Sequence, residues 1–145
     1  ESVRDPQNVG AIIRVAAAFG VDRIVMSKYC ADIYSSKTVR ASMGTLFSTR
    51  VDRVADIPCV IRNLTDSGRR VFAAALNREA QRLGEFAVQS GDCVVIGNEG
   101  HGVSQAVLDA CTGSVIIPMS EGPESLNAAV ASGVVMWEAA RVRLK

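Results

Sequence analysis

The sequence of 145 residues has few aromatic side chains, which make up 5% of it, with a single tryptophan and a single histidine. It is rich instead in hydrophobic residues, at 48%, and Ala, Val, Ile and Gly dominate, as expected where helices pack on a parallel sheet. No apolar run reaches the roughly 20 residues that a membrane span requires, and no signal sequence is evident. We therefore expect one soluble, cytoplasmic α/β domain over residues 1–145.

The sequence also lacks an excess of either charge, because its 16 basic and 15 acidic residues leave a net charge of +1. Any affinity for nucleic acid must then come from local patches. No two cysteines lie close enough in sequence for a zinc or redox motif, so no metal is expected. We expect reduced and mostly buried thiols at Cys30, Cys59, Cys93 and Cys111.

Apolar runs alternate with amphipathic stretches, which predicts consecutive βα units. A first helix should begin near Asp5 and stop at Gly20. Strands are predicted at 23–27, 47–51, 71–76, 93–97 and 114–118, and further helices at 52–66, 104–111 and about 125–143. The last helix carries small residues and Trp137, a face that could bury against a sheet or a second subunit.

The first segment with chemical potential is Asp5–Gly10, followed by Arg14. Asn8 and Arg14 are separated by about 600° of helical rotation, so both reach one site only if the helix start is kinked or capped. The alternative is that Asn8 caps the helix and Arg14 is a solvated surface residue.

The second segment, Val94–Ser104, is a buried strand that runs into a loop with three glycines. Glycines at a strand end allow close approach of a ligand or another backbone. Their spacing fits neither the dinucleotide fingerprint nor the phosphate-binding lysine loop. Glu99 either points at a ligand or holds the loop, whereas His101 has no partner in sequence and is left out of catalysis.

The third segment comprises Ile116–Met119 and Glu124–Ala131, where Ser125 or Asn127 could cap the last helix. Capping alone would explain this segment. Polar, glycine-bearing segments at three strand ends are nevertheless an improbable coincidence without a ligand, so together they predict one site.

These three segments, in this order, resemble the three motifs of the SpoU/TrmH branch of the SPOUT methyltransferases. Asp5–Gly20 resembles the first motif, Ile96–Gly102 the second, and Ile117–Met119 with Ser125–Asn127 the third. Ala41–Gly44 resembles a further family segment. The resemblance covers nearly the whole chain and implies methyl transfer from S-adenosylmethionine to a ribose 2′-hydroxyl of rRNA or tRNA.

The resemblance also implies a parallel sheet with flanking helices and a C-terminal trefoil knot, and a homodimer that shares its sites between subunits. It implies a reaction site at Asn8, Arg14, Glu99, Ser125 and Asn127. The implied cofactor-binding residues are Leu76, Asn77, Gly97, Asn98, Glu99, Gly100, Ile117, Pro118, Met119, Ser125, Leu126, Asn127 and Ala128. A guanidinium rarely accepts a proton, so we expect Arg14 to stabilise an alkoxide or phosphate more readily than to act as a base.

One departure from the family is that its members usually carry a strand before the first motif, and many add an N-terminal RNA-binding region. Neither is fully visible in these residues, so RNA selection is expected outside them. Two other classes stay open: a nucleotide-dependent oxidoreductase, opposed by the missing glycine fingerprint, and a catalytically silent RNA-binding protein of the same fold, opposed by the retained polar residues.

Overall fold

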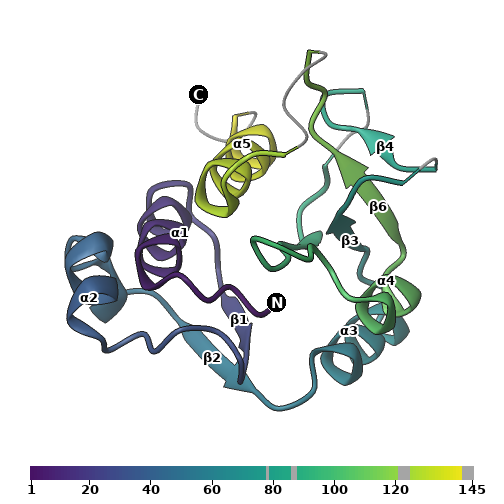
Figure 1. The fold of residues 1–145 in the computed structure, drawn as a ribbon. Helices are drawn as coiled ribbons and strands as arrows, with labels where there is room; N and C mark the ends of the chain where they lie inside the picture. Colours follow the sequence, from purple (N-terminus) through teal and green to yellow (C-terminus); the bar gives the residue numbers. More distant parts are fainter. Residues whose placement is uncertain (78, 86–87, 121–124, 142–145) are drawn as a thin grey trace.

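The computed structural model describes residues 1–77, 79–85, 88–120 and 125–141, and Figure 1 shows their arrangement. In chain order the elements are α1 (Pro6–Ala18), β1 (Ile24–Ser27), α2 (Ser36–Ser42), the 3₁₀ helix η1 (Thr45–Phe47), β2 (Val51–Val54), α3 (Ile57–Asp66), β3 (Val71–Ala74), β4 (Gln81–Arg82), β5 (Cys93–Val95), α4 (Gln105–Ala110), β6 (Gly113–Ile116) and α5 (Ala128–Ala140).

The strands form two sheets in which every pairing is parallel. β1 pairs with β2, with Ile24 opposite Val51, and the other four strands follow the order β4-β6-β3-β5. In the larger sheet β3 lies between β5 and β6, and Phe72 is opposite both Val94 and Gly113. Parallel strands need crossover connections, and these are supplied by the helices. The expected parallel sheet with flanking helices is thus confirmed.

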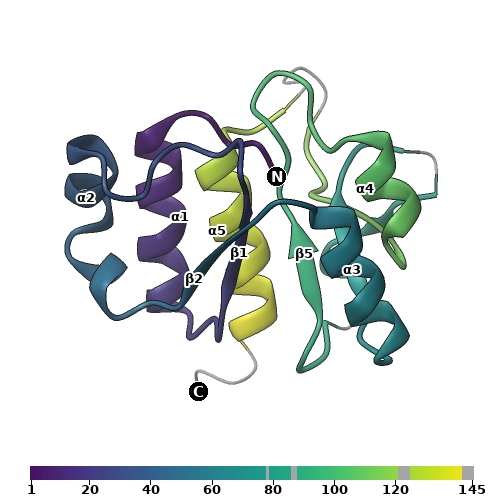
Figure 2. The ribbon, with the colours of Figure 1, turned by 90° about the horizontal axis from the view of Figure 1, so that it is seen from below.

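Neighbouring side chains on a strand point to opposite sides, and here both sides are apolar, so helices cover both faces of the strands. On β3, Val71 and Ala73 pack in a cluster with α3 and α4, whereas Phe72 packs in a cluster that includes Val135 of α5. The same division holds for β1, where Met26 packs towards α1. In Figure 2, α1 and α5 accordingly lie on one side of the strands and α3 and α4 on the other.

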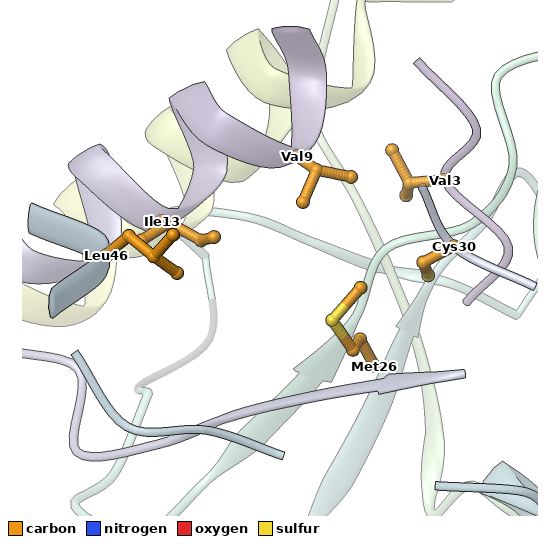
Figure 3. Close-up of a cluster of buried hydrophobic side chains, with 6 residues drawn as sticks. All are labelled: Val3, Val9, Ile13, Met26, Cys30 and Leu46. Atoms are coloured by element: carbon orange, nitrogen blue, oxygen red, sulfur yellow. The ribbon is translucent and has the colours of Figure 1, made fainter. Parts of the chain in front are cut away.

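The first residues of the chain are anchored in the core beneath α1. Val3 is buried in one cluster with Val9 and Ile13 of α1, Met26, Cys30 and Leu46 (Figure 3). Asp5 caps α1 by accepting a hydrogen bond from the amide of Gln7 at 2.8 Å, and Pro6 occupies the first helical turn, where its missing N–H costs nothing. The N-terminal segment therefore enters α1 from a fixed position.

Gly10 lets α2 approach α1 closely. A Cβ at this position would lie 2.5 Å from the carbonyl oxygen of Thr38 and 2.6 Å from the Cβ of Ala41. Thr38 and Ser42 are fully buried at this contact. The segment Ala41–Gly44 thus takes part in a helix crossing that fixes the position of α1.

Three sequence predictions were wrong in detail, and two elements were not predicted. Residues 47–51 do not form a strand: η1 ends at Phe47 and the strand begins at Val51. The helix expected from residue 52 begins at Ile57, because Asp56 caps it by accepting from the amide of Cys59. Helix α2 and strand β4 were not predicted. The last helix begins at Ala128, not at Ser125, and its expected end near Arg143 lies outside the described residues.

The prediction of mostly buried cysteines was also wrong, because only Cys30 is buried, while Cys59 is exposed and Cys93 and Cys111 are intermediate. All four thiols are free. Partial burial raises the pKa of Cys111 to about 11, so this thiol stays protonated at neutral pH. Within the described ranges, no helix has the length and apolarity that crossing a bilayer requires.

Candidate functional site

Three polar side chains from the three sequence motifs are joined in one hydrogen-bonded relay, which we define as Asn127, Asn8 and Glu99. The amide of Asn127 donates to the Oδ1 atom of Asn8 at 2.9 Å, across 119 positions of sequence. The amide of Asn8 in turn donates to the Oε1 atom of Glu99 at 3.0 Å. Asn8 is buried, whereas Glu99 and Asn127 are exposed, so both bonds are partly buried. The structure therefore brings together the segments that the sequence predicted to form one site.

The alternative interpretation, in which Asn8 caps the helix, is wrong. Asn8 lies in the first turn of α1, one turn beyond the cap residue Asp5. Its side chain instead connects α1 with the loop after β5 and with the start of α5. A buried amide with both its donor and its acceptor engaged is costly to replace, because the partners would lose their bonds as well.

Glu99 accepts backbone hydrogen bonds in addition to that of Asn8. The amide of Arg4 donates to its Oε2 atom at 3.2 Å and the amide of Asp5 to its Oε1 atom at 3.1 Å. Burial by itself raises the pKa of the Glu99 carboxyl, but these donors and Asn8 together outweigh it and lower the pKa below the usual value. An ionised carboxylate that already accepts several bonds is a poor general base, so the geometry favours a role in holding the loop.

The loop after β5 is closed by Asn98 and Gly97. The Oδ1 atom of Asn98 accepts from the amides of Gly100 at 2.9 Å and His101 at 3.1 Å, and its amide donates to the carbonyl of Ser2 at 2.8 Å. A Cβ on Gly97 would lie 2.2 Å from the carbonyl carbon of Gly102, so only glycine fits there. Gly97 thus accommodates a crossing backbone, whereas Gly100 has open surroundings.

Asn127 also caps α5, which decides between the two expected cap residues. Its Oδ1 atom accepts from the amides of Ala129 at 2.9 Å and Val130 at 3.2 Å. Ser125 is exposed and, within the part of the chain that the structure describes, its hydroxyl has no hydrogen-bond partner. Its side chain is therefore available to a ligand.

Arg14 is not brought to the relay within one chain. It is exposed, whereas Asn8, six positions earlier on the same unbroken helix, is buried. The 600° rotation between them corresponds to different helix faces. Among the described residues Arg14 forms no ion pair or hydrogen bond, so its guanidinium is free to meet a group from outside this chain.

The remaining predicted cofactor residues follow β3 and β6 or precede α5. Three of these loops each expose one large apolar side chain: Leu76, Met119 and Leu126. Ile117 and Pro118 continue directly from β6, and Ala128 is buried at the start of α5. Exposed apolar side chains suit the flat face of a heterocycle such as adenine.

A concavity of about 490 Å³ lies between the loop after β3 and α4. Of the predicted residues it includes only Asn77, whose amide donates to the Oγ atom of Ser114 at 2.8 Å. Its other lining residues are mainly polar, Gln105 and Asp109 among them. Among the described residues, no group of three or more His, Cys, Asp or Glu side chains is arranged to hold a metal ion.

Sequence reasoning missed the backbone amides of Arg4 and Asp5, which hold Glu99, and the guanidinium of Arg53. Arg53 donates to the carbonyls of Lys28 and Cys30 from one nitrogen and to that of Ala31 from the other, at 2.9 to 3.1 Å. No sequence pattern identifies a backbone donor or a side chain that binds carbonyls. From sequence alone, an arginine on a short strand is expected to be an ordinary exposed residue.

Helices on both faces of parallel strands define this chain as an α/β domain, and the polar loops gathered at the strand ends are its candidate site. Residues 1–137 match the SpoU rRNA methylase family. Together with the relay that joins its motifs, this match shows that the chain belongs to the SpoU rRNA methylase family.

Individual relatives agree with that assignment. An uncharacterised tRNA/rRNA methyltransferase of Synechocystis is 36% identical over 97% of this chain and 51% of its own length. The 23S rRNA (guanosine(2553)-2′-O)-methyltransferase of Bacillus subtilis is 33% identical over 94% of this chain and 54% of its own. The AdoMet-bound rRNA methyltransferase of Sinorhizobium meliloti superposes with a TM-score of 0.90 at 33% identity, covering 99% of this chain and 54% of that one. The chain spans about half the length of the curated relatives it matches.

Proposed function

We propose that the protein transfers a methyl group from S-adenosylmethionine to a ribose 2′-hydroxyl of rRNA or tRNA in the cytoplasm. The observation that carries the proposal is the Asn127–Asn8–Glu99 relay, which unites three motifs in a chain of the SpoU family. The Bacillus relative supports the ribose as the methylated group, and the Sinorhizobium relative supports the cofactor.

The cofactor residues proposed from sequence fit such a molecule. Backbone groups of the loops after β3, β5 and β6 and before α5 would bind the adenine and the amino-acid part, and Leu76, Met119 and Leu126 would cover its apolar surface. We assign Asn77, Gly97–Gly100, Ile117–Met119 and Ser125–Ala128 to this binding. When bound, the cofactor supplies an electrophilic methyl group on a sulfonium and leaves as a neutral thioether. We further propose that these loops belong to a C-terminal trefoil knot.

The relay residues act by position in this proposal. Asn8 and Glu99 hold the loop after β5 against the start of α1, and Asn127 holds the start of α5. The exposed hydroxyl of Ser125 is left to contact substrate. Because Arg14 of the first motif lies on a different face of α1 from Asn8, it serves a second subunit's site in a homodimer in this proposal. There its charge stabilises the developing 2′-alkoxide or the adjacent phosphate, while the proton passes to water.

We also propose that residues 1–145 form one catalytic domain and that RNA selection depends on a further region. The relatives' greater length supports this division. A near-neutral net charge of +1 supports it too, because the domain has no global attraction for phosphate.

The product decides the reaction. RNA methylated with labelled cofactor should carry the label in dinucleotides that resist alkali, because a methylated 2′-oxygen cannot attack the neighbouring phosphate. Label in alkali-sensitive mononucleotides would assign the methyl group to a base instead. Calorimetry separates the other classes: binding of NAD but not S-adenosylmethionine indicates an oxidoreductase, and cofactor binding without transfer to any RNA indicates a silent RNA-binding protein.

A further inference from the structure

The loop after β1, residues 28–35, exposes two aromatic rings. Tyr29 is 60% exposed and Tyr34 is 70% exposed. They are the only two tyrosines in a sequence with few aromatic residues. We call this segment the tyrosine loop. Neither ring contributes to a core cluster, so folding does not explain why both are aromatic.

The tyrosine loop is held in a fixed shape despite its exposure. Arg53 of β2 donates to the carbonyls of Lys28, Cys30 and Ala31. Within the loop, the amide of Tyr34 donates to the Oδ1 atom of Asp32 at 3.0 Å. Cys30 is itself buried in the core. Rings presented from a loop that is already ordered lose little conformational entropy when they bind.

The tyrosine loop flanks the relay at the same end of the strands. The amide of Ala31 donates to the carbonyl of Val3 at 2.9 Å, while the next two residues, Arg4 and Asp5, donate their amides to Glu99. One short segment thus lies between the loop after β1 and the loop after β5. Figure 2 shows both loops at the end of the molecule where α1 and α5 begin.

Cations accompany the rings. The Nζ atom of Lys28 lies 5.0 Å from the centre of the Tyr29 ring, and Lys37 and Arg40 are exposed on α2, directly after the loop. None of these three side chains pairs with a carboxylate among the described residues. Asp32, an acidic residue of the same loop, accepts a hydrogen bond from the Tyr34 amide. Exposed aromatic rings interleaved with unpaired cations match the chemistry of single-stranded nucleic acid, in which bases stack and phosphates attract positive charge.

We propose that the tyrosine loop is an RNA-contact surface on which unpaired bases flanking the target nucleotide stack on Tyr29 and Tyr34, with Lys28, Lys37 and Arg40 meeting the backbone. The inference rests on the proposed function, since it names how the same site receives its substrate. It gives this domain an RNA contact of its own.

The two tyrosines allow a direct test. The full chain with 3-fluorotyrosine contains two ¹⁹F labels, both in the tyrosine loop. A mixed-sequence single-stranded oligoribonucleotide should shift both signals, whereas S-adenosylhomocysteine should leave them in place. Replacing both residues (Tyr29→Ala with Tyr34→Ala) should weaken binding of this oligonucleotide about tenfold or more, as expected when base stacking is lost.

Two control variants isolate stacking. Tyr29→Phe with Tyr34→Phe keeps both rings and should retain affinity for the oligonucleotide. Phe47→Ala removes a ring that is 74% exposed on η1, outside the tyrosine loop, and should also retain affinity for the oligonucleotide. Melting temperatures of all three variants should stay close to that of the wild type.

The outcomes separate this proposal from the proposed function. Unmoved ¹⁹F signals at saturating oligonucleotide, or unchanged affinity in the alanine variant, overturn the RNA-contact surface even if S-adenosylmethionine still binds. An equal loss of affinity for the oligonucleotide in the phenylalanine variant or in Phe47→Ala also overturns it. A change of oligomeric state in the alanine variant overturns it too, because it would indicate that the tyrosine loop is a subunit interface. Tyrosine-dependent RNA binding without cofactor binding supports the surface and contradicts the methyltransferase.

Discussion

Asn127 donates a hydrogen bond to the Oδ1 atom of Asn8 at 2.9 Å. Among the described residues, this is the only hydrogen bond that the Asn8 side chain accepts. The bond connects the start of α5 to the first turn of α1 and leaves the Asn8 amide to serve Glu99. One buried side chain thus couples the first and the last motif of the chain.

We expect Asn8→Ala to lower the free energy of unfolding by about 1–2 kcal/mol, because Asn127 and Glu99 each lose a partly buried hydrogen bond. Cofactor affinity should fall as well, since the loop after β5 loses an attachment. Thermal unfolding and calorimetry with S-adenosylhomocysteine measure the two effects. Gln7→Ala, an exposed neighbour on the same helix turn, is the matched control and should change neither.

Asn8→Asp should destabilise the protein in a pH-dependent way. At neutral pH the new carboxylate would face Glu99 without a proton to donate, so two like charges would meet in place of a hydrogen bond. Protonation of either group on acidification restores a donor, so the loss of stability relative to wild type should shrink as the pH falls. A difference in melting temperature that is constant from neutral pH to pH 4 would contradict the geometry of the relay.

Glu99 itself should make stability depend on pH. Its pKa is lower in the folded protein than its ordinary value, so the stabilisation is present above the ordinary pKa and is lost as the pH falls through the folded value. Glu99→Gln should therefore be less stable than wild type at neutral pH, and the difference should begin to shrink below about pH 4.3 and be lost once the pH falls below the folded pKa. Denaturant unfolding across this range gives the comparison, and curves that stay parallel would show that Glu99 is not held by these donors.

Gly97 and Gly100 should respond differently to substitution. Gly97→Ala places a Cβ 2.4 Å from the amide nitrogen of Val103, against backbone that cannot move alone, so the loop must shift. We expect a loss of about 1–3 kcal/mol in unfolding free energy, together with weakened cofactor binding. Gly100→Ala meets only the Oδ1 atom of Asn98 at 3.5 Å, an ordinary contact, and is the control. Equal effects of the two variants would disprove the assignment of Gly97 to a backbone crossing.

Trp137 and Arg14 test the homodimer. Trp137 is 52% exposed and contacts Phe19 with ring centroids 5.8 Å apart, so it is not buried against the sheet, and a second subunit is the surface against which it is expected to bury. Trp137→Ala should convert a dimer to a monomer, which light scattering measures as a halved mass. The control Phe47→Ala should remain a dimer. A monomeric wild type at micromolar concentration would contradict the dimer.

Arg14→Ala should leave cofactor affinity intact and reduce methyl transfer about a hundredfold or more. If Arg14 serves the opposite subunit, mixing this variant with a cofactor-site variant, Gly97→Val, should restore about a quarter of wild-type activity, because half of the randomly assorted dimers contain one complete site. Mixtures without activity would place Arg14 in its own subunit's site.

The sequence predicted the fold class, the first helix and four of the strands because β-branched runs and helix caps are local signals. It misplaced the region from residue 47 to residue 56, where polar residues separate Phe47 from Val51 and Val54, and only the cap at Asp56 marks the true helix start. It also predicted that the three motifs share a site. It did not predict which atoms join them, because the bonds of Asn8 reach residues 91 and 119 positions away and no local pattern encodes them.

The relay also determines when the site can exist during synthesis of the chain. Its members lie near the beginning, the middle and the end of the sequence, so Asn8 has neither polar partner until residue 99 has been made, and the relay closes only with residue 127. Contacts of such long range form late and slowly in folding. A nascent or truncated chain that stops before α5 can therefore contain β1 to β6 and yet lack the complete relay.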